Sequence, residues 1–383
     1  MEEDRLVGEF QSLFASSPDR LWRSPGRVTI IGDHTDYEGG QSLAAAVSEG
    51  VLVGVRDRSD GRVRAESLIT GEVLDVDLSD LVARMEKASS SGAPASGLTG
   101  FVGGVLCLCD RRTGADILVG GTLPPGAGLS SSAALSLALI GALSRADGPD
   151  PSWPAMAQTV ENRYLGVPSG LLDELAILYA RDGCAVLIDA GRKTAVAVPF
   201  DWEQAGRVLL IVDTGVSRRL SDTPYGERVQ EARQAALRLR VPNLASVGPE
   251  DVERLSDTPL WRRRARHVTN ENRRVEETVA AAARGDWGAV AALMRASHAS
   301  LRDDYEVSLT VLDTTCALLD SLDPQGGARL TGAGFGGSAI ALLPAEVEAR
   351  ARLNLFQMYD EHGFGTPRLL SLRRPARGLE RIT

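Results

Sequence analysis

Hydrophobic positions along the chain change between strand-like and helix-like spacing without a regular order. The short apolar runs Arg27–Gly32 and Leu52–Val55 are typical of buried strands, and Glu72–Leu78 alternates as a half-buried strand does. From Glu3 to Ala15 the apolar residues recur at helical spacing instead. A doubly wound sheet would need strands and helices in strict turn, so this mixture predicts an α+β fold.

The pattern restarts at a buried strand, Val208–Val212, after which helical spacing dominates. We therefore expect two lobes, an N-terminal one over residues 1–195 and a C-terminal, more helical one over residues 196–383. Small and turn-forming residues in Ser89–Ser96 (SSSGAPAS) predict a surface loop in the first lobe. In the second lobe the spacing predicts helices near 225–239, 261–284, 287–301, 309–322 and 345–359, and strands near 328–331, 338–343 and 368–372.

Composition narrows the classes of partner. The chain has 42 Lys and Arg against 51 Asp and Glu, a formal charge of −9, which disfavours nucleic acid and anionic membranes as partners. No apolar run approaches the roughly 20 residues of a membrane span, and the acidic start MEED is unlike a secretory signal. We expect a cytoplasmic protein whose cysteines are reduced core thiols: Cys107, Cys109, Cys184 and Cys316.

The segment Gly120–Leu135 (GGTLPPGAGLSSSAAL) joins a predicted strand to a helix expected from about Ser131. Its small residues permit a close approach of the backbone, and a helix start offers free N–H groups and a positive dipole end, which suit phosphate. The three serines can also bind phosphate or Mg²⁺. A serine cap of the helix is the simpler alternative, but a cap needs one serine only. The P-loop pattern G-x-x-x-x-G-K-[ST] is absent.

A second segment, Ser24–Gly40 (SPGRVTIIGDHTDYEGG), carries a predicted buried strand directly into Asp33, His34 and Asp36. Two acids beside a histidine suit hydrogen bonds to several hydroxyls of one small polar ligand. A metal site is an alternative, because Asp-His-x-Asp offers ligand groups. A solvated turn is the third possibility, and the segment alone leaves all three open.

A third segment, Thr331–Ser338 (TGAGFGGS), matches G-x-G-x-x-G from Gly332 to Gly337. A dinucleotide site needs a helix to open there, whereas the following SAIALL predicts a strand. We therefore interpret the glycines as a turn that presses against another loop or a ligand.

Taken in their order along the chain, the three segments resemble the motifs of the kinase superfamily that includes galactokinase, homoserine kinase and mevalonate kinase. GRVTIIGDHTDYEGG is most similar to the galactokinase signature, and the resemblance covers roughly residues 5 to 375. It implies a two-lobed α+β small-molecule kinase with its active site between the lobes. The implied reaction uses ATP and Mg²⁺ to phosphorylate the anomeric hydroxyl of galactose or a relative. We expect a monomer or a weak homodimer.

The resemblance also implies roles for single residues. Asp173, in GLLDE, matches the aspartate that faces the reacting hydroxyl, and Arg27 matches its partner; whether Asp173 takes the proton or mainly positions the hydroxyl stays open. Glu161 matches the Mg²⁺ carboxylate, with Ser131 favoured over Ser132 as the hydroxyl ligand. The implied sugar contacts are Asp33, His34, Asp36, Gly170 and Tyr225. The implied ATP contacts are Gly126, Gly128, Leu129, Ser130, Ser131, Ser132, Ala133 and Gly334.

Some residues depart from the galactokinase pattern. Asp33 stands where that pattern has glutamate, and Arg218 or Arg219 replaces the usual histidine before Leu220. A shorter acid and an added arginine leave galacturonate, glucuronate, arabinose or an amino sugar as alternative substrates. A non-catalytic sugar and ATP sensor is a further alternative, although the intact serine run favours catalysis. The acids after the first strand disfavour a decarboxylase of the mevalonate branch.

Overall fold

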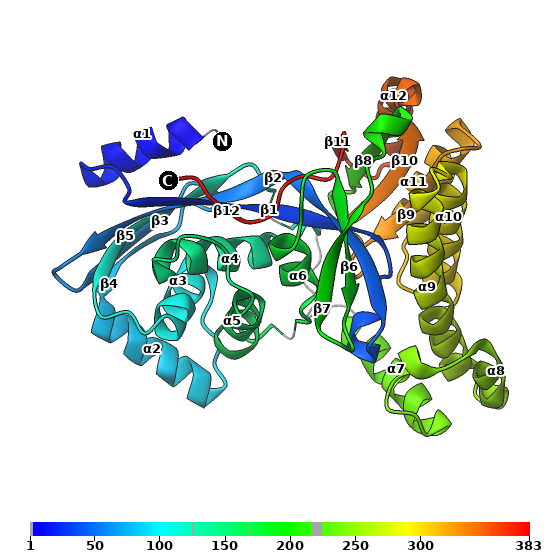
Figure 1. Cartoon of the computed structure of the whole chain (residues 1–383), viewed down its shortest axis with the longest axis horizontal. Coiled ribbons are helices and arrows are strands. Elements are labelled where there is room, and N and C mark those ends of the chain that lie inside the picture. The colour runs from blue at the N-terminus through cyan, green and yellow to red at the C-terminus, as the bar shows by residue number, and fades with distance from the viewer. Residues whose placement is uncertain (1–2, 125, 168, 217–223) are drawn as a thin grey trace.

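Two β-sheets organise the chain, and each carries its own helices (Figure 1). The computed structural model describes residues 3–124, 126–167, 169–216 and 224–383. Within these ranges strands and helices follow one another without strict alternation, which confirms the α+β class. In this part of the chain, no helix has both the length and the apolar character that a membrane crossing requires.

The first sheet contains strands β1 (Arg20–Ile31), β2 (Gln41–Arg58), β3 (Arg62–Ser67), β4 (Val73–Asp77), β5 (Gly114–Gly121), β6 (Cys184–Asp189), β7 (Thr194–Pro199) and β12 (Glu380–Arg381). Their order is β12-β1-β2-β5-β3-β4, and β6 joins at β2 and carries β7. The long antiparallel pair β1 and β2 lies within this sheet, with the register Arg20↔Val55 at one end and Ile31↔Leu43 at the other. The connection between these two strands, residues 32–40, therefore contains Asp33, His34 and Asp36 and lies at the end of the sheet.

Helices cover both faces of this sheet. They are α1 (Glu3–Phe14), α2 (Leu78–Ser91), α3 (Gly97–Leu108), α4 (Ser131–Ser144), α5 (Trp153–Thr159) and α6 (Leu172–Leu178). α1 lies on one face, where Leu6 and Phe10 join a small apolar cluster, and α2 to α5 lie on the other (Figure 1). α4 packs on β1 and β2, and its nearly continuous apolar sequence is buried there. Burial of α4 fixes the position of the serines at its start.

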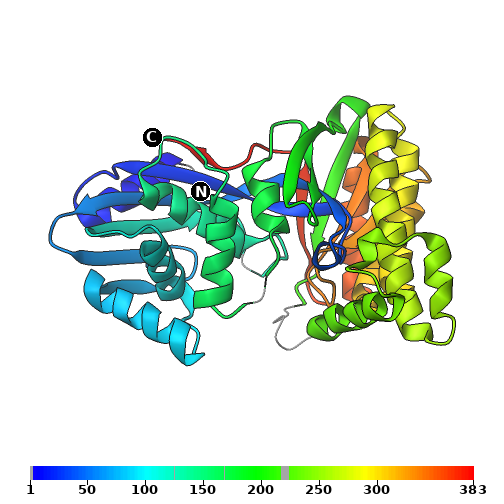
Figure 2. The ribbon, with the colours of Figure 1, turned by 60° about the horizontal axis from the view of Figure 1, so that its bottom comes forward.

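The second sheet has the order β11-β8-β10-β9 and is antiparallel throughout. Its strands are β8 (Arg207–Asp213), β9 (Gly327–Thr331), β10 (Ser338–Pro344) and β11 (Arg368–Leu372). The helices of this lobe are α7 (Tyr225–Leu239), α8 (Pro249–Val252), α9 (Pro259–Ala283), α10 (Trp287–Asp303), α11 (Thr310–Leu322) and α12 (Glu348–His362). α10 and α11 pack on β9, and α9 lies beside α10 and α7 (Figures 1 and 2).

The two lobes share a hydrophobic core at their junction. Ile30 of β1 and Leu43 of β2 belong to the same cluster as Ile211, Val275 and Ile340 of the second lobe. Figure 2 shows the ends of β1 and β2 reaching toward that lobe. The loop that follows β1 therefore lies where both sheets can contribute side chains.

The predicted division between residues 195 and 196 falls inside β7. The chain passes from the first sheet to the second between Pro199 and Arg207, and it returns at the end, where β12 pairs with β1. The extent of each lobe along the sequence stays a prediction.

Several predicted elements differ from the structure in length. β1 and β2 extend well beyond their predicted runs, because the strands continue through small and turn-forming residues that hide the apolar pattern, with a bulge between Pro25 and Arg27. The predicted loop Ser89–Ser96 is wrong at its start, since α2 runs to Ser91 and ends at Gly92 in the left-handed conformation. α5 leads directly into a π-helical turn, Val160–Tyr164.

Candidate active site

A cavity of about 300 Å³ lies where the two lobes meet. Its walls include three segments that we name the acidic loop (residues 32–40), the serine loop (residues 120–132) and the glycine turn (residues 331–338). All but three of the predicted site residues line it: Arg27, Asp33, His34, Asp36, Gly126, Gly128, Ser130, Ser131, Ser132, Glu161, Gly170, Asp173 and Tyr225. The structure thus brings together residues that are far apart in the sequence.

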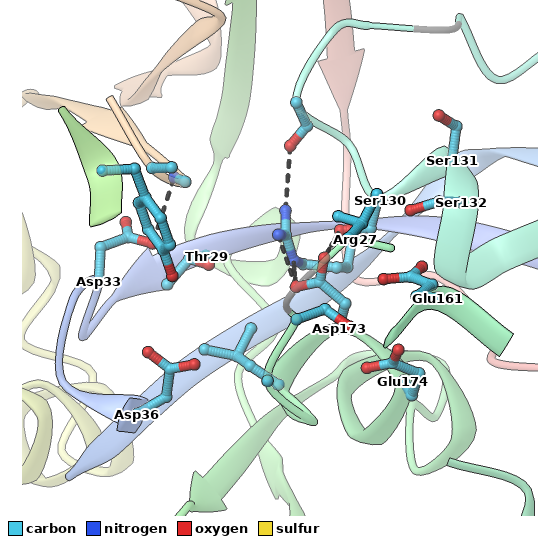
Figure 3. Close-up of a pocket in the computed structure, with 18 of the residues that line it drawn as sticks. Arg27, Thr29, Asp33, Asp36, Ser130, Ser131, Ser132, Glu161, Asp173 and Glu174 are labelled. Atoms are coloured by element: carbon cyan, nitrogen blue, oxygen red, sulfur yellow. Dashed lines mark hydrogen bonds and ion pairs between the residues drawn. The ribbon is translucent and has the colours of Figure 1, made fainter. Parts of the chain in front are cut away.

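Arg27 and Asp173 form an ion pair in the middle of the cavity (Figure 3). Asp173 is at the start of α6, and Arg27 comes from β1. Nε and Nη2 of Arg27 lie 2.7 and 2.6 Å from the same carboxylate oxygen, Oδ1. Nη1 donates to the carbonyl oxygen of Gly128 at 3.0 Å, and the backbone N–H donates to that of Leu129 at 3.1 Å. Arg27 therefore ties the strand, the serine loop and the carboxylate of Asp173 into one unit.

Ser130 engages the other oxygen of Asp173. Its hydroxyl donates to Oδ2 at 2.5 Å. Ser130 is the N-cap residue of α4, yet its side chain does not cap the helix, and its backbone is left-handed with φ 59°. The alternative of a serine cap is therefore wrong for Ser130. The N–H groups at the start of α4 keep no side-chain cap among the described residues, as a phosphate-binding helix start requires.

Glu161 lies on the serine side of the Arg27–Asp173 pair (Figure 3). It belongs to the π-helical turn, a form often found at functional sites, and is 5% exposed. Its Oε1 has no hydrogen-bond partner among the described residues. Burial raises the pKa of Glu161, while the hydroxyls of Ser132 and Ser169 lower it. An orphaned, buried carboxylate oxygen close to a serine hydroxyl fits a divalent cation.

Glu174 is a cavity residue that the sequence reasoning missed. It is 1% exposed, and neither carboxylate oxygen has a hydrogen-bond partner in the described part of the chain. Burial raises the pKa of Glu174 well above its usual range, and the charges of Glu161 and Asp173 raise it further. The signal in the sequence was an acid directly after Asp173 in an otherwise apolar helix.

The acidic loop binds the glycine turn. Asp33 accepts from Nη2 of Arg329 at 2.6 Å and from the N–H of Gly332 at 3.2 Å. Burial raises the pKa of Asp33, and the charge of Arg329 opposes that rise. His34, with φ 61°, lies with Nε2 3.2 Å from the carbonyl oxygen of Ala333. Sequence reasoning missed Arg329, because a pairing across 296 residues leaves no local pattern.

Asp36, Gly170 and Tyr225 meet at the same end of the cavity. A Cβ on Gly170 would lie 2.5 Å from Oδ2 of Asp36, so a larger residue would require this carboxylate to move. Burial raises the pKa of Asp36 to about 6. The ring of Tyr225 has its centroid 5.7 Å from that of His34, and burial raises the pKa of its phenol.

Three predicted ATP contacts do not line the cavity. The side chains of Leu129 and Ala133 belong to the hydrophobic core. Gly334 has φ 71°, and a Cβ there would lie 2.3 Å from the carbonyl oxygen of Val307. Packing within the fold therefore explains why this position is a glycine. Contact of these residues with a nucleotide stays a prediction. Arg218 and Arg219 lie outside the described residues.

The glycine turn leads into β10, a strand, which agrees with the rejection of a dinucleotide site. Ser338, at the start of β10, donates its hydroxyl to the carbonyl oxygen of Ala127 at 2.6 Å. The glycine turn thus contacts both the serine loop and the acidic loop. This agrees with the prediction that the glycines form a turn packed against another loop.

The polar groups of the cavity form two sets, one on each side of the Arg27–Asp173 pair. Figure 3 shows Asp33 and Asp36 on one side of the Arg27–Asp173 pair, and Ser131, Ser132 and Glu161 on the other. Acids can bind the hydroxyls of a polar ligand at one end, and a helix start with serines can bind phosphate at the other. The arrangement suits transfer of a phosphoryl group to a hydroxyl beside Asp173.

Family models match three parts of the chain. Residues 8–57 match the galactokinase galactose-binding signature. Residues 100–181 match the N-terminal domain of GHMP kinases, and residues 278–360 match their C-terminal domain.

Curated and solved proteins are similar over nearly the whole chain. Galactokinase of Streptomyces coelicolor is 36% identical over 354 residues, which are 88% of each chain. Galactokinase of Roseiflexus sp. is 34% identical over 372 residues, 94% of this chain and 93% of that one. The crystal structure of Lactococcus lactis galactokinase complexed with galactose superposes with a TM-score of 0.88 and 29% identity, over 98% of this chain and 99% of that one. A mevalonate kinase, at 18% identity and a TM-score of 0.67, shares the fold.

Proposed function

The chain belongs to the galactokinase family and is an ATP-dependent sugar kinase, and we propose that it converts galactose and ATP to galactose 1-phosphate and ADP. The observation that carries this proposal is the position of the Arg27–Asp173 pair between an acidic end and a serine end of one cavity. The names of the relatives and the galactose in the Lactococcus lactis structure support it.

The acidic end is the proposed sugar site. Asp36 offers carboxylate oxygens and Tyr225 a phenol to sugar hydroxyls, and Gly170 leaves room beside Asp36. His34 is held through its ring nitrogens by the Tyr37 hydroxyl and the carbonyl of Ala333. Asp33 is engaged by Arg329 and Gly332, so it supports the loop as well as facing the cavity.

Asp173 and Arg27 are the proposed catalytic residues. Oδ1 of Asp173 is held by Arg27, and Oδ2, which accepts from the Ser130 hydroxyl in this structure, is the proposed acceptor of the anomeric hydroxyl of the sugar. The sugar oxygen forms a bond to the γ-phosphorus while the bond to the bridging oxygen of ADP breaks, and the hydroxyl proton passes to Oδ2. The guanidinium of Arg27 faces the charge that develops on the phosphoryl group.

The serine end is the proposed phosphate site, with N–H groups of α4 and the hydroxyls of Ser131 and Ser132 as donors. Glu161 and Ser132 are the proposed ligands of Mg²⁺. The hydroxyl of Ser132 interacts with Glu161, and Figure 3 shows Ser132 between Ser131 and Glu161. This replaces the expectation of Ser131. When bound, Mg²⁺ neutralises charge on the phosphates.

The charges of the cavity favour a neutral sugar over a uronic acid. Among the described lining residues, Arg27 is the only Lys or Arg, and it is already paired with Asp173. Asp36, at the acidic end, would repel the carboxylate of a uronic acid. The intact serine end also supports catalysis rather than sensing alone. A cytoplasmic location and a monomeric or weakly dimeric state stay predictions.

A sugar panel with MgATP tests the proposal. ADP release is measured with galactose, galacturonate, glucuronate, arabinose and galactosamine, and the product is identified by phosphorus and carbon NMR. We expect the highest kcat/KM for galactose and phosphate on C1. A higher kcat/KM for a uronic acid, or phosphate on C6, would overturn the proposed substrate or position.

A further inference from the structure

Ser130 adopts a conformation that the fold alone does not explain. It is a non-glycine residue with φ 59° and ψ 45°, which costs stability relative to a right-handed residue. It also stands at the N-cap of α4 without capping the helix, so the usual stabilisation by an N-cap serine is lost. Strain of this kind at a cavity wall points to a functional role.

The conformation aims the hydroxyl at Asp173. Oγ of Ser130 donates to Oδ2 at 2.5 Å, while both nitrogens of Arg27 are directed at Oδ1. Ser130 is 9% exposed, and the Asp173 side chain is 33% exposed toward the cavity. The Ser130 hydroxyl therefore donates to the one carboxylate oxygen of Asp173 that Arg27 leaves for a substrate hydroxyl.

We propose that Ser130 is a positioning residue that holds the place of the sugar's anomeric hydroxyl on Asp173 until the sugar binds. This rests on the proposed function, in which that hydroxyl donates to Oδ2. The sugar displaces the Ser130 hydroxyl because its other hydroxyls bind at the acidic end, whereas a water molecule has no such additional contacts. In the sugar-free complex with ATP, Ser130 thus excludes water from the acceptor.

The consequence is protection of ATP. A water on Oδ2 would attack the γ-phosphorus: its oxygen forms the new P–O bond, the bond to ADP breaks, and its proton passes to Asp173. The products are ADP and phosphate without a phosphorylated sugar. A phosphate contact alone does not account for Ser130, because its hydroxyl donates to Asp173.

Ser130→Gly is the test variant, since glycine adopts positive φ without strain and the loop keeps its shape. Ser130→Ala removes the same hydroxyl but keeps the Cβ. The matched control is Ser136→Ala in the same helix, where a fully buried hydroxyl has no partner among the described residues and lies away from the cavity. ADP release from MgATP is measured without sugar and with galactose, and the Kd of ADP by calorimetry.

We expect sugar-free ATP hydrolysis to rise about tenfold or more in both Ser130 variants, with the Kd of ADP within about twofold of wild type. Ser136→Ala should leave both quantities unchanged. Adding Asp173→Asn to Ser130→Gly should remove the rise.

Unchanged sugar-free hydrolysis in the Ser130 variants would overturn the proposal, and so would a rise that survives Asp173→Asn. A tenfold weaker Kd of ADP would show instead that Ser130 binds phosphate. The two measurements that decide the proposal, ATP hydrolysis without sugar and the Kd of ADP, contain no sugar. Their failure is therefore distinct from failure of the proposed function, which the sugar panel with the wild-type protein tests.

Discussion

Arg329 and Asp33 form a buried ion pair that joins the two lobes, with Nη2 2.6 Å from Oδ2. The Arg329 side chain is fully buried, and Asp33 is 5% exposed. The second oxygen of Asp33 accepts from the N–H of Gly332, in the glycine turn. Both oxygens of an acid at the proposed sugar site are therefore used by the second lobe, which explains how the fold accommodates aspartate at this position.

Asp33→Glu is expected to lower kcat/KM for galactose by about tenfold or more, with KM for ATP within about twofold of wild type. The added methylene has to fit beside the buried Arg329 and Gly332, and overpacking of this kind costs about 1–3 kcal/mol. It also moves the carboxylate within the acidic loop. Steady-state kinetics with galactose and the sugar panel check this. If galactose is not the natural sugar, the variant should raise the galactose rate instead, and a change confined to ATP would show that residue 33 does not govern sugar selection.

Arg329→Met should destabilise the protein by about 3–5 kcal/mol, because it leaves the Asp33 carboxylate buried and unpaired. Adding Asp33→Asn removes that charge, so the double variant should regain part of the lost stability. Urea unfolding of the wild type, both single variants and the double variant gives the coupling. Additive losses would mean that the two side chains do not interact in solution.

Asp173→Asn is expected to lower kcat by about 10²–10⁴-fold while the melting temperature and the Kd of ADP change little. The amide cannot accept the hydroxyl proton. Its carbonyl oxygen can still accept from Arg27, and its NH₂ group then takes the place of Oδ2. The pair is partly exposed, with 33% exposure of the Asp173 side chain, so its loss costs little stability. A kcat near that of wild type would remove Asp173 from the proposed mechanism.

Glu161→Ala and Ser132→Ala are expected to weaken Mn²⁺ binding in the presence of ADP, each by about tenfold, and to be less than additive when combined. Two groups that hold one ion act as a unit. Mn²⁺ is titrated by electron paramagnetic resonance, which reports binding without turnover. Ser131→Ala is the comparison, because Ser131 lies farther from Glu161 in the same loop (Figure 3). A larger effect from Ser131→Ala than from Ser132→Ala would restore the original expectation of Ser131.

The sequence alone predicted elements whose apolar spacing is regular. The helix expected at 225–239 and the strand expected at 368–372 have those bounds in the structure. Arg27, Glu161 and Asp173 were found through the resemblance, and the cavity unites them. Arg329 and Glu174 were missed, because burial and long-range pairing decide their roles and neither leaves a periodic signal. Ser130 was placed in the correct loop, but its contact with Asp173 depends on a left-handed backbone that the serine run does not reveal.

Glu174→Gln is expected to stabilise the nucleotide-free protein at about pH 8 by on the order of 1–3 kcal/mol, the range for a buried polar group without a partner. Burial holds the pKa of Glu174 well above its usual range in the folded state, whereas the unfolded chain has the ordinary value. Between the two values the folded state binds the extra proton, so wild-type stability falls as pH rises through this window. Glutamine cannot ionise and is free of that loss. The gain should therefore shrink toward about pH 4, where glutamate is protonated in both states. Urea unfolding in EDTA at both pH values measures it, with the exposed Glu276→Gln in α9 as the control that should show no such pH dependence. A gain of equal size at both pH values, or a variant less stable than wild type at about pH 8, would show that Glu174 is not held as a buried, unpaired acid.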